Sequence, residues 1–216
     1  MAENKKKISK KTLNKSFNLW FWGALTCFSQ EHMQTFGYLS SMLPIIKELY
    51  PDKKEQQEKI HAYTAFFNTN PMLGSVIIGT TASMEEARAN GKGIDGETIN
   101  DMRAGLMGPI AGIGDSLIDG TLIPILLGLA LGMSQNGSPV GAIFYIIVWD
   151  LIAYFGQRFL YFRGYKLGDK AVSILVGKQG KAIRHAISII GGMVVGGVLA
   201  SWVNVTTSKT QLVKYS

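Results

Sequence analysis

The chain has 216 residues, a formal net charge of +7 at pH 7 and one cysteine, Cys27. A single cysteine excludes an intramolecular disulfide framework, and the basic excess does not indicate nucleic acid, because the cations do not alternate with stackable aromatic residues. Charges crowd residues 1–15, 47–103 and 157–185, and the tracts between them carry almost none. This block pattern favours a polytopic membrane protein over a globule with a mixed surface.

The N-terminal part of the chain is basic and then amphipathic. Residues 1–12 are rich in lysine and are expected to form a flexible tail. From Lys11 to Tyr50 apolar and aromatic residues recur near helical spacing, which predicts amphipathic helices. Trp20 and Trp22 suit either a membrane interface or an ordinary core, and the pattern leaves both roles open.

A charged segment, a turn and a short apolar segment come next. Residues 53–67 are expected to form a charged helix. The tetrapeptide 68–71 (Asn-Thr-Asn-Pro) predicts a turn between helices, because the residue before a proline disfavours helix, and its proline can begin the next helix. The apolar segment Met72–Met84 is too short to cross ~30 Å of hydrocarbon. We therefore expect it to be re-entrant or buried, and to end at Glu85-Glu86.

The tract from Ala104 to Met133 contains only two charged residues, Asp115 and Asp119. Glycines and two prolines interrupt its apolar residues, which predicts broken helices. Irregular backbone at membrane depth is tolerated only inside protein or beside a water-filled cavity. The tract is therefore a candidate substrate region of a transporter.

Two further apolar runs lie near the C-terminus, at 139–156 and 186–205. The second is uncharged, and a helix of that length spans ~30 Å, so it predicts a glycine-rich transmembrane helix. Its Gly192 and Gly196 form a G-x-x-x-G pair that would allow another helix to approach closely. The basic segment 157–185 between the runs is expected to be a cytoplasmic loop.

Residues 112–117 contain the letters of the GDSL hydrolase motif, in which Ser116 would be the nucleophile. A serine hydroxyl needs a histidine base, yet no Asp-x-x-His follows, since the only later histidine is His185 and Ala182 stands three residues before it. A membrane esterase is therefore a minor alternative. The three histidines are also too far apart in the sequence to predict a metal site.

Amide and carboxylate side chains beside the apolar segments are candidates for substrate binding. Asn68, Asn70 and Asp115 could hold hydroxyl groups such as those of a sugar. An unpaired polar group in apolar surroundings costs roughly 2–7 kcal/mol, so these groups need partners. The same residue types cap helices, and the local pattern leaves both roles open.

An ordered series of motifs resembles the IID subunits of mannose-family phosphotransferase permeases. The resemblance covers most of residues 11–205, and it also includes Gly164-Tyr165-x-x-Gly168 and the glycine-rich segment 191–197. The main motifs are Glu31-His32-Met33-Gln34, His61 followed by Phe66-Phe67-Asn68-Thr69-Asn70-Pro71, Ser83-Met84-Glu85-Glu86, and Met107-Gly108-Pro109-Ile110-Ala111-Gly112-Ile113-Gly114-Asp115-Ser116.

The resemblance implies an all-α, multi-pass protein of the bacterial inner membrane that pairs with a IIC chain, as a trimer of such pairs. The pair would carry a sugar inward while soluble IIA and IIB carriers phosphorylate it, so this chain would be no enzyme by itself and would need no cofactor. Mannose, fructose, sorbose, N-acetylgalactosamine and glucosamine are all possible substrates. The substrate-binding residues expected here are Asn68, Asn70, Gln34, His61 and Asp115. The alternative is a structural scaffold subunit that makes no sugar contacts.

The chain departs from the family pattern at two places. We expect a membrane domain at 13–205 followed by a polar tail at 206–216, whereas the family continues with another apolar hairpin, which indicates a truncation or a short variant. Asp119 stands where a bulky apolar or aromatic residue is expected.

Overall fold

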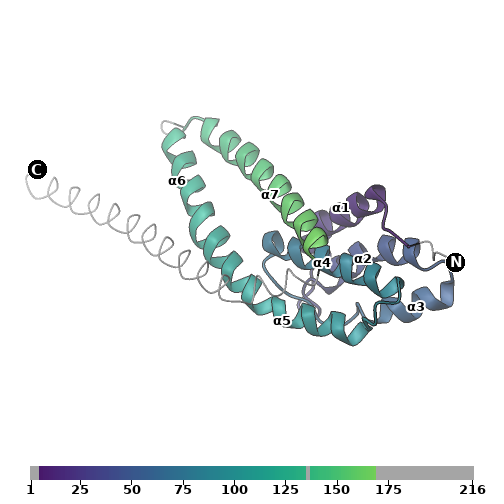
Figure 1. Cartoon of the computed structure of the whole chain (residues 1–216). Coiled ribbons are helices and arrows are strands. Elements are labelled where there is room, and N and C mark those ends of the chain that lie inside the picture. The colour runs from purple at the N-terminus through teal and green to yellow at the C-terminus, as the bar shows by residue number, and fades with distance from the viewer. Residues whose placement is uncertain (1–4, 135–136, 169–216) are drawn as a thin grey trace, which may run out of the picture.

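The computed structural model describes residues 5–134 and 137–168, and this part of the chain is helical without a β-strand (Figure 1). The predicted all-α membrane fold is confirmed, while the predicted helix at 186–205 lies outside the described residues. The elements in chain order are α1 (Lys10–Thr26), α2 (Thr35–Leu49), α3 (Lys53–His61), α4 (Pro71–Ala89), α5 (Gly96–Gly114), the π-helix η1 (Asp115–Leu122), α6 (Ile123–Met133) and α7 (Val140–Leu167).

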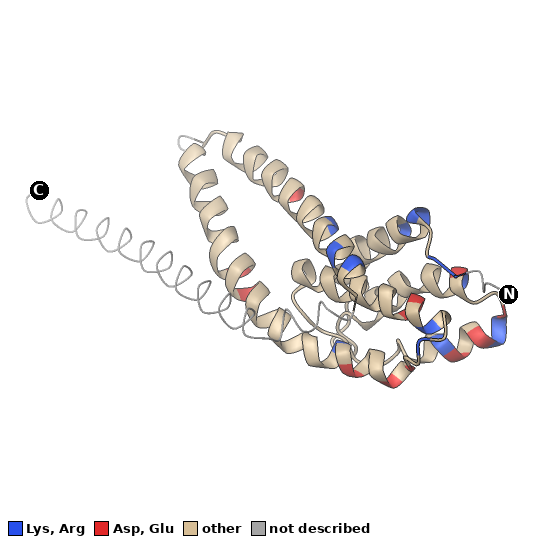
Figure 2. Ribbon diagram, in the orientation of Figure 1, with Lys and Arg blue, Asp and Glu red and all other residues tan. Residues whose placement is uncertain are grey.

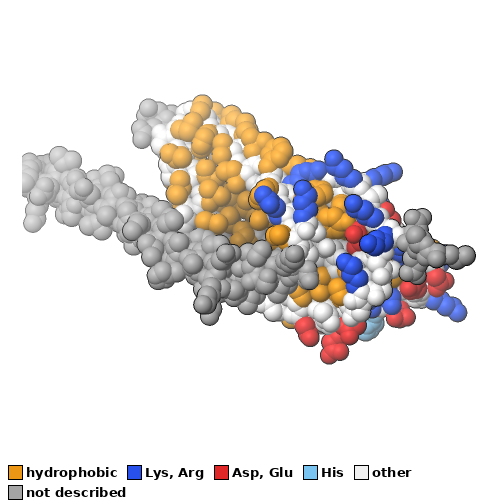
Figure 3. All heavy atoms as spheres, viewed as in Figure 1, with side chains coloured by type: hydrophobic (Ala, Val, Ile, Leu, Met, Phe, Trp, Pro, Cys, Tyr) orange, Lys and Arg blue, Asp and Glu red, His pale blue; other side chains and the backbone are white. Residues whose placement is uncertain are grey.

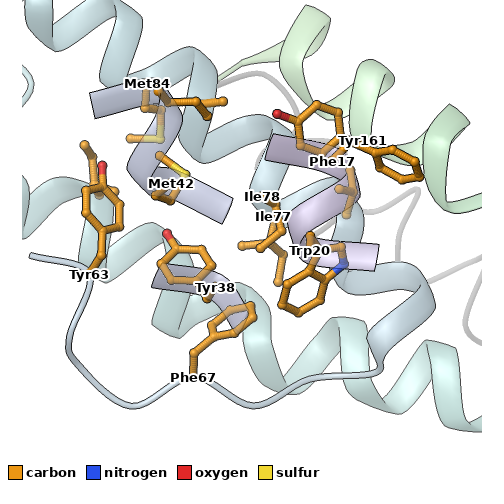
Figure 4. Close-up of a cluster of buried hydrophobic side chains, with 14 of the residues drawn as sticks. Phe17, Trp20, Tyr38, Met42, Tyr63, Phe67, Ile77, Ile78, Met84 and Tyr161 are labelled. Atoms are coloured by element: carbon orange, nitrogen blue, oxygen red, sulfur yellow. The ribbon is translucent and has the colours of Figure 1, made fainter. Parts of the chain in front are cut away.

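Helix α4 lies at the centre of the packed body and contacts α1, α2, α5 and α7. Its Ile77 and Ile78 are fully buried among aromatic side chains from α1, α2 and α7 (Figure 4). Burying an apolar side chain of this size contributes about 1.5–3 kcal/mol to stability. The expectation that the 72–84 segment is buried is confirmed.

A series of hydrogen bonds crosses the core and connects α1, α4 and α7. The Trp20 indole Nε1 donates a hydrogen bond to Ser75 Oγ at 3.1 Å, and Ser75 Oγ donates to Gln157 Oε1 at 3.2 Å. All three side chains are buried. Trp20 therefore belongs to the core, which decides between the two roles that the sequence left open for it, whereas Trp22 is 68% exposed.

The C-terminal end of α4 was predicted wrongly. The helix does not end at Glu85-Glu86 but continues to Ala89, because Glu85 is satisfied inside the protein. The hydroxyls of Tyr50 and Tyr63 both donate to its carboxylate, and burial raises the pKa of each tyrosine, which keeps it protonated as a donor.

The expected helix at 53–67 is also too long. Helix α3 ends at His61, and residues 62–70 form an irregular connection. Phe67 is fully buried, and its backbone N–H donates to Thr35 Oγ1 at 2.9 Å. This tertiary contact draws the chain away from a helical path, an effect that local sequence does not encode.

Helices α5, η1 and α6 form one continuous helix over Gly96–Met133, and α7 returns beside α6 as a hairpin (Figure 1). Both are long and apolar enough to cross a membrane by length and composition. The predicted break takes the form of the π-helical turn η1 rather than a gap in the helix. Such turns widen a helix locally and occur often at functional sites.

Residues 157–167 were expected in a loop but belong to α7, and this expectation was wrong. Helices α4 and α7 approach so closely that a Cβ on Gly79 or Gly164 would overlap the backbone of the other helix. The Tyr165 hydroxyl also donates to Glu86 Oε2 at 2.5 Å. Packing against α4 therefore keeps this charged part of the chain helical.

Residues before α1 are held against the body. Ile8 is buried, and its backbone N–H donates to Glu86 Oε2 at 2.8 Å. Ser9 caps α1 by accepting from the backbone N–H of Thr12 at 3.2 Å. The division into a tail, a membrane domain and a C-terminal tail stays a prediction, although the described part of the expected tail is bonded to the body at Lys6 and Ile8.

Candidate functional site

The turn before α4 is fixed by Gln34, which lies just before α2. The Gln34 side chain donates from Nε2 to the Thr69 carbonyl at 2.9 Å and accepts from the Thr69 N–H at 3.2 Å. Thr69 Oγ1 in turn donates to the Met107 carbonyl of α5 at 3.1 Å. Gln34 and Thr69 are both buried, so this two-way amide contact holds residues 68–70 in one conformation.

Asn70 uses both ends of its amide. Its Oδ1 caps α4 by accepting from the N–H groups of Met72 at 3.1 Å and Leu73 at 3.2 Å. Its Nδ2 donates to Asp115 Oδ1 at 3.2 Å and to Asp119 Oδ2 at 3.1 Å. The capping role and the role beside a polar site, which the sequence left as alternatives, therefore coexist in one buried side chain.

The two carboxylates lie one turn apart on η1, in a stretch of helix that is otherwise uncharged (Figure 2). Both aspartates are exposed, while the asparagine between them and α4 is 3% exposed. Gly114 permits this contact, because a Cβ at that position would overlap the Asn70 side chain. We call the group formed by Gln34, Thr69, Asn70, Asp115 and Asp119 the polar junction.

The structure brings together three of the five predicted residues: Gln34, Asn70 and Asp115. Asn68 is exposed beside them, and its backbone N–H points to Met107 Sδ at 3.3 Å. His61 is exposed at the end of α3, and within the described residues its side chain makes no hydrogen bond to the other four. Asp119 was missed because an apolar residue was expected there, although its i, i+4 spacing from Asp115 signals a shared helix face.

The esterase alternative gains no support from the local geometry. The Ser116 hydroxyl donates to the Gly112 carbonyl one turn back in its own helix, at 2.8 Å. His185, the only later histidine, lies outside the described residues. Across residues 5–134 and 137–168, no group of three or more His, Cys, Asp or Glu side chains could hold a metal ion.

A second feature is a cleft of about 1200 Å³ at the C-terminal end of α4, which we call the cationic cleft. Asn90 holds the N-terminal segment across it, accepting from the Lys6 N–H at 2.9 Å and donating to the Lys6 carbonyl at 2.8 Å. The backbone that carries Lys5, Lys6 and Lys7 is therefore held along one edge of the cleft. The cations lining the cleft are Lys5, Lys6, Lys7, Lys59, Arg88 and Lys92, against the two acids Glu55 and Glu86.

The third feature is the apolar surface of the α6–α7 hairpin, which faces outward in Figure 3 while lysines and arginines gather on the packed body. A contiguous exposed apolar patch of this kind marks contact with a membrane or a partner protein. Its exposed large apolar residues are Ile125, Leu127, Leu129, Leu131, Met133, Val140, Ile143, Ile146, Ile147, Leu151, Phe155 and Phe159.

Comparisons with known proteins agree on one family. A family profile described as "PTS system mannose/fructose/sorbose family IID component" matches residues 7–215. The fructose permease IID component of Bacillus subtilis is 34% identical over 209 residues, which are 94% of this chain and 74% of that protein. The mannose-specific EIID component of Escherichia coli K12 is 36% identical over 180 residues. This alignment covers 81% of the chain but only 62% of that relative, so the chain matches less than two thirds of its length.

Two solved structures share the fold. One is the cryoEM structure of the mannose transporter ManYZ with microcin E492, with a TM-score of 0.72 and 32% identity over 91% of this chain and 72% of that chain. The other is described as a membrane protein, with a TM-score of 0.79 and 32% identity over 89% of this chain and 71% of that chain.

Proposed function

Because this chain belongs to the mannose/fructose/sorbose family of IID components of the phosphotransferase system, we propose that it forms a sugar-translocating pair with a IIC chain. The pair carries a sugar inward, and soluble IIA and IIB carriers supply the phosphoryl group. Three pairs assemble in the bacterial inner membrane, which the chain crosses more than once. Two helices long enough to span, in the described residues alone, support the multi-pass arrangement.

The observation that carries the proposal is the polar junction, whose Asp115 and Asp119 belong to a helix long enough to span the membrane. Polar groups at such a depth are costly, and in transporters they mark substrate pathways. Asn70 orients Asp115 and Asp119 through its Nδ2, and each carboxylate has further lone pairs that can accept from sugar hydroxyls. The pair would then work by alternating access, with one packed unit moving against another around the bound sugar.

The predicted residues take different roles in this proposal. Asn70 and Asp115 hold the sugar, Asp119 joins them, and exposed Asn68 contributes its amide from the adjacent turn. Gln34 is a positioning residue, because it is buried and both ends of its amide are bonded to the Thr69 backbone. His61 is left out of this proposal, because it lies at the end of α3 and its side chain makes no hydrogen bond to the other four predicted residues within the described part of the chain.

The outer surfaces suit the proposed partners. The apolar hairpin would face lipid and the IIC chain. The cationic cleft would receive an acidic surface of a soluble carrier, because it lies near the end of α7 that carries Arg163 and Lys166. Gly168, which follows α7, lies against Ser83 of the cleft. Positive charge flanking membrane spans marks the cytoplasmic side, where the carriers act.

The test is sugar uptake by cells that lack other permeases and express the four components together. Mannose, fructose and sorbose would be screened first, since relatives carry these names. We expect Asn70→Asp and Asn68→Ala to reduce uptake while membrane levels of the chain stay normal, and Ser116→Ala to leave uptake unchanged. Normal uptake by both asparagine variants would favour the second candidate, a scaffold subunit, for which the helix-capping role of Asn70 is the supporting observation.

A further inference from the structure

A groove of about 580 Å³ runs along the outer side of α1 and is closed on one edge by Ser40 of α2. Its polarity changes along its length. Lys11 and Lys15 line the end nearest the start of α1, and Leu19 and Trp22 line the other half together with the smaller Gly23, Thr26 and Cys27. Both lysines are exposed, and neither forms a salt bridge with any acidic side chain among the described residues. The groove therefore presents free positive charge at one end and uncovered apolar surface at the other.

Contacts between α1 and α7 show which part of α7 lies beside each end of the groove. At the lysine end, Arg158 of α7 donates from Nη2 to Asn14 Oδ1 at 2.8 Å. At the apolar end, the ring of Phe21 lies 5.3 Å from that of Tyr154 and 4.9 Å from that of Trp22. The lysine end of the groove thus lies beside the charged Arg158, and its apolar end lies beside Tyr154, in the apolar part of α7.

The apolar end of the groove is continuous with the exposed face of the span. Trp22 packs on Phe21, which packs on Tyr154, and Tyr154 packs on Phe155, an exposed residue of α7. An amphipathic ring at such a place suits the boundary between headgroups and acyl chains. The groove therefore matches the order of a lipid leaflet: the two lysines lie where headgroups are expected, and the apolar end lies where acyl chains are expected.

We propose that this groove binds a phospholipid with an anionic headgroup. The headgroup phosphate sits between the ammonium groups of Lys11 and Lys15, and an acyl chain lies along Leu19 and Trp22 toward Phe155. Basic clusters beside a membrane attract anionic lipids, while apolar surface takes up the chain. The cationic cleft differs, because none of the residues described as lining it is an exposed large apolar side chain. A lipid thus fits the groove and a soluble anion fits the cleft.

The test uses the purified pair of this chain with its IIC partner. Phosphatidylglycerol and phosphatidylcholine with identical acyl chains are titrated into the detergent-solubilised pair, and bound lipid is counted by native mass spectrometry. We expect phosphatidylglycerol to bind more tightly by on the order of tenfold. Lys11→Gln/Lys15→Gln should abolish this preference. The matched control Lys53→Gln/Lys54→Gln, which removes the same charge from exposed positions on α3, should keep it.

A second measurement locates the chain. Phosphatidylglycerol with brominated acyl chains should quench part of the tryptophan fluorescence, and Trp22→Phe should remove that part. The proposal is overturned if Lys11→Gln/Lys15→Gln retains the preference, or if the quenching is the same in Trp22→Phe. It is also overturned if glycerol phosphate, which has no acyl chains, displaces the lipid at equal concentration, because the groove would then bind a soluble anion.

Discussion

Asn70 combines a folding role and a site role that substitutions can separate. Asp at this position keeps a capping oxygen for Met72 and Leu73, but it replaces the donor that faces Asp115 and Asp119 with a third acidic group. Ala removes both functions. The loss of an N-cap costs about 1 kcal/mol, and unpairing buried groups adds to that.

We therefore predict that Asn70→Ala lowers the thermal unfolding temperature of the purified chain in detergent. Asn70→Asp should keep the cap and lose the bridge to the carboxylates. Acidifying the buffer should restore stability to Asn70→Asp, because protonating one carboxyl relieves repulsion among three, and it should not restore Asn70→Ala. Equal responses of the two variants to pH would contradict the assignment of separate roles to Oδ1 and Nδ2.

Gly114 offers a second test at the residue scale, because a Cβ there would overlap Asn70 while a Cβ on Gly112 meets open space. Gly114→Ala should destabilise by about 1–3 kcal/mol through overpacking and should displace the Asn70 amide. Gly112→Ala should be neutral or stabilising by up to about 1 kcal/mol, since alanine favours helix. Thermal melts of the two variants compare these effects, and equal melting temperatures would show that α4 and η1 do not meet at Gly114.

Asn70 and Asp115 of the polar junction were predicted from the sequence, whereas Thr69, Asp119 and the contact made by Gln34 were not. Isolated polar residues next to apolar tracts need partners, and this singled out Asn70 and Asp115. The partnership of Gln34 with Thr69 is a contact between residues far apart in sequence, so only the resemblance suggested Gln34. Asp119 could have been predicted from its i, i+4 spacing to Asp115, but the family resemblance implied an apolar residue at that position.

At the scale of elements, helix starts were easier to predict than helix ends. The Asn-Pro sequence before α4 encodes its own start through capping and proline geometry. The ends of α3, α4 and α7 depend on partners elsewhere: Thr35 for the connection after α3, two tyrosines for α4, and α4 itself for α7. Charge along the sequence suggested the wrong ends for α4 and α7, and the Asn-Pro turn suggested too late an end for α3.

The close crossing of α4 and α7 makes a prediction about the packed body. Gly79→Ala or Gly164→Ala should force the two helices apart and lower the melting temperature of the chain. The matched control is Gly128→Ala on α6, where a Cβ has nothing within 4 Å. If Gly79→Ala and Gly128→Ala melted at the same temperature, α4 and α7 would not be in backbone contact at Gly79.

At the scale of the whole molecule, the described part of the chain consists of a packed body with charged surfaces and an apolar hairpin. Leu131 on the hairpin is 71% exposed, and the Glu58 side chain on the body is 72% exposed. In a chain with Cys27 replaced by Ser, a cysteine at either position would be equally reachable in water. Hydrocarbon or a partner chain around the hairpin would change that.

We predict that, in membrane vesicles open to reagent on both sides, a membrane-impermeant maleimide labels Glu58→Cys and spares Leu131→Cys. Denaturing detergent should make both positions reactive, which controls for expression and for intrinsic reactivity. Rapid labelling of Leu131→Cys in intact membranes would mean that water surrounds the hairpin.

The central claim is that the polar junction holds the sugar, and direct binding to the purified pair of this chain with IIC tests it without any phosphoryl transfer. Calorimetric titration with the sugar identified by uptake should show binding to the wild-type pair. It should show none to the pair carrying Asn70→Asp, with Lys53→Gln as a control that binds normally. Undiminished sugar binding by a folded Asn70→Asp pair would contradict the account and leave the sugar to IIC alone.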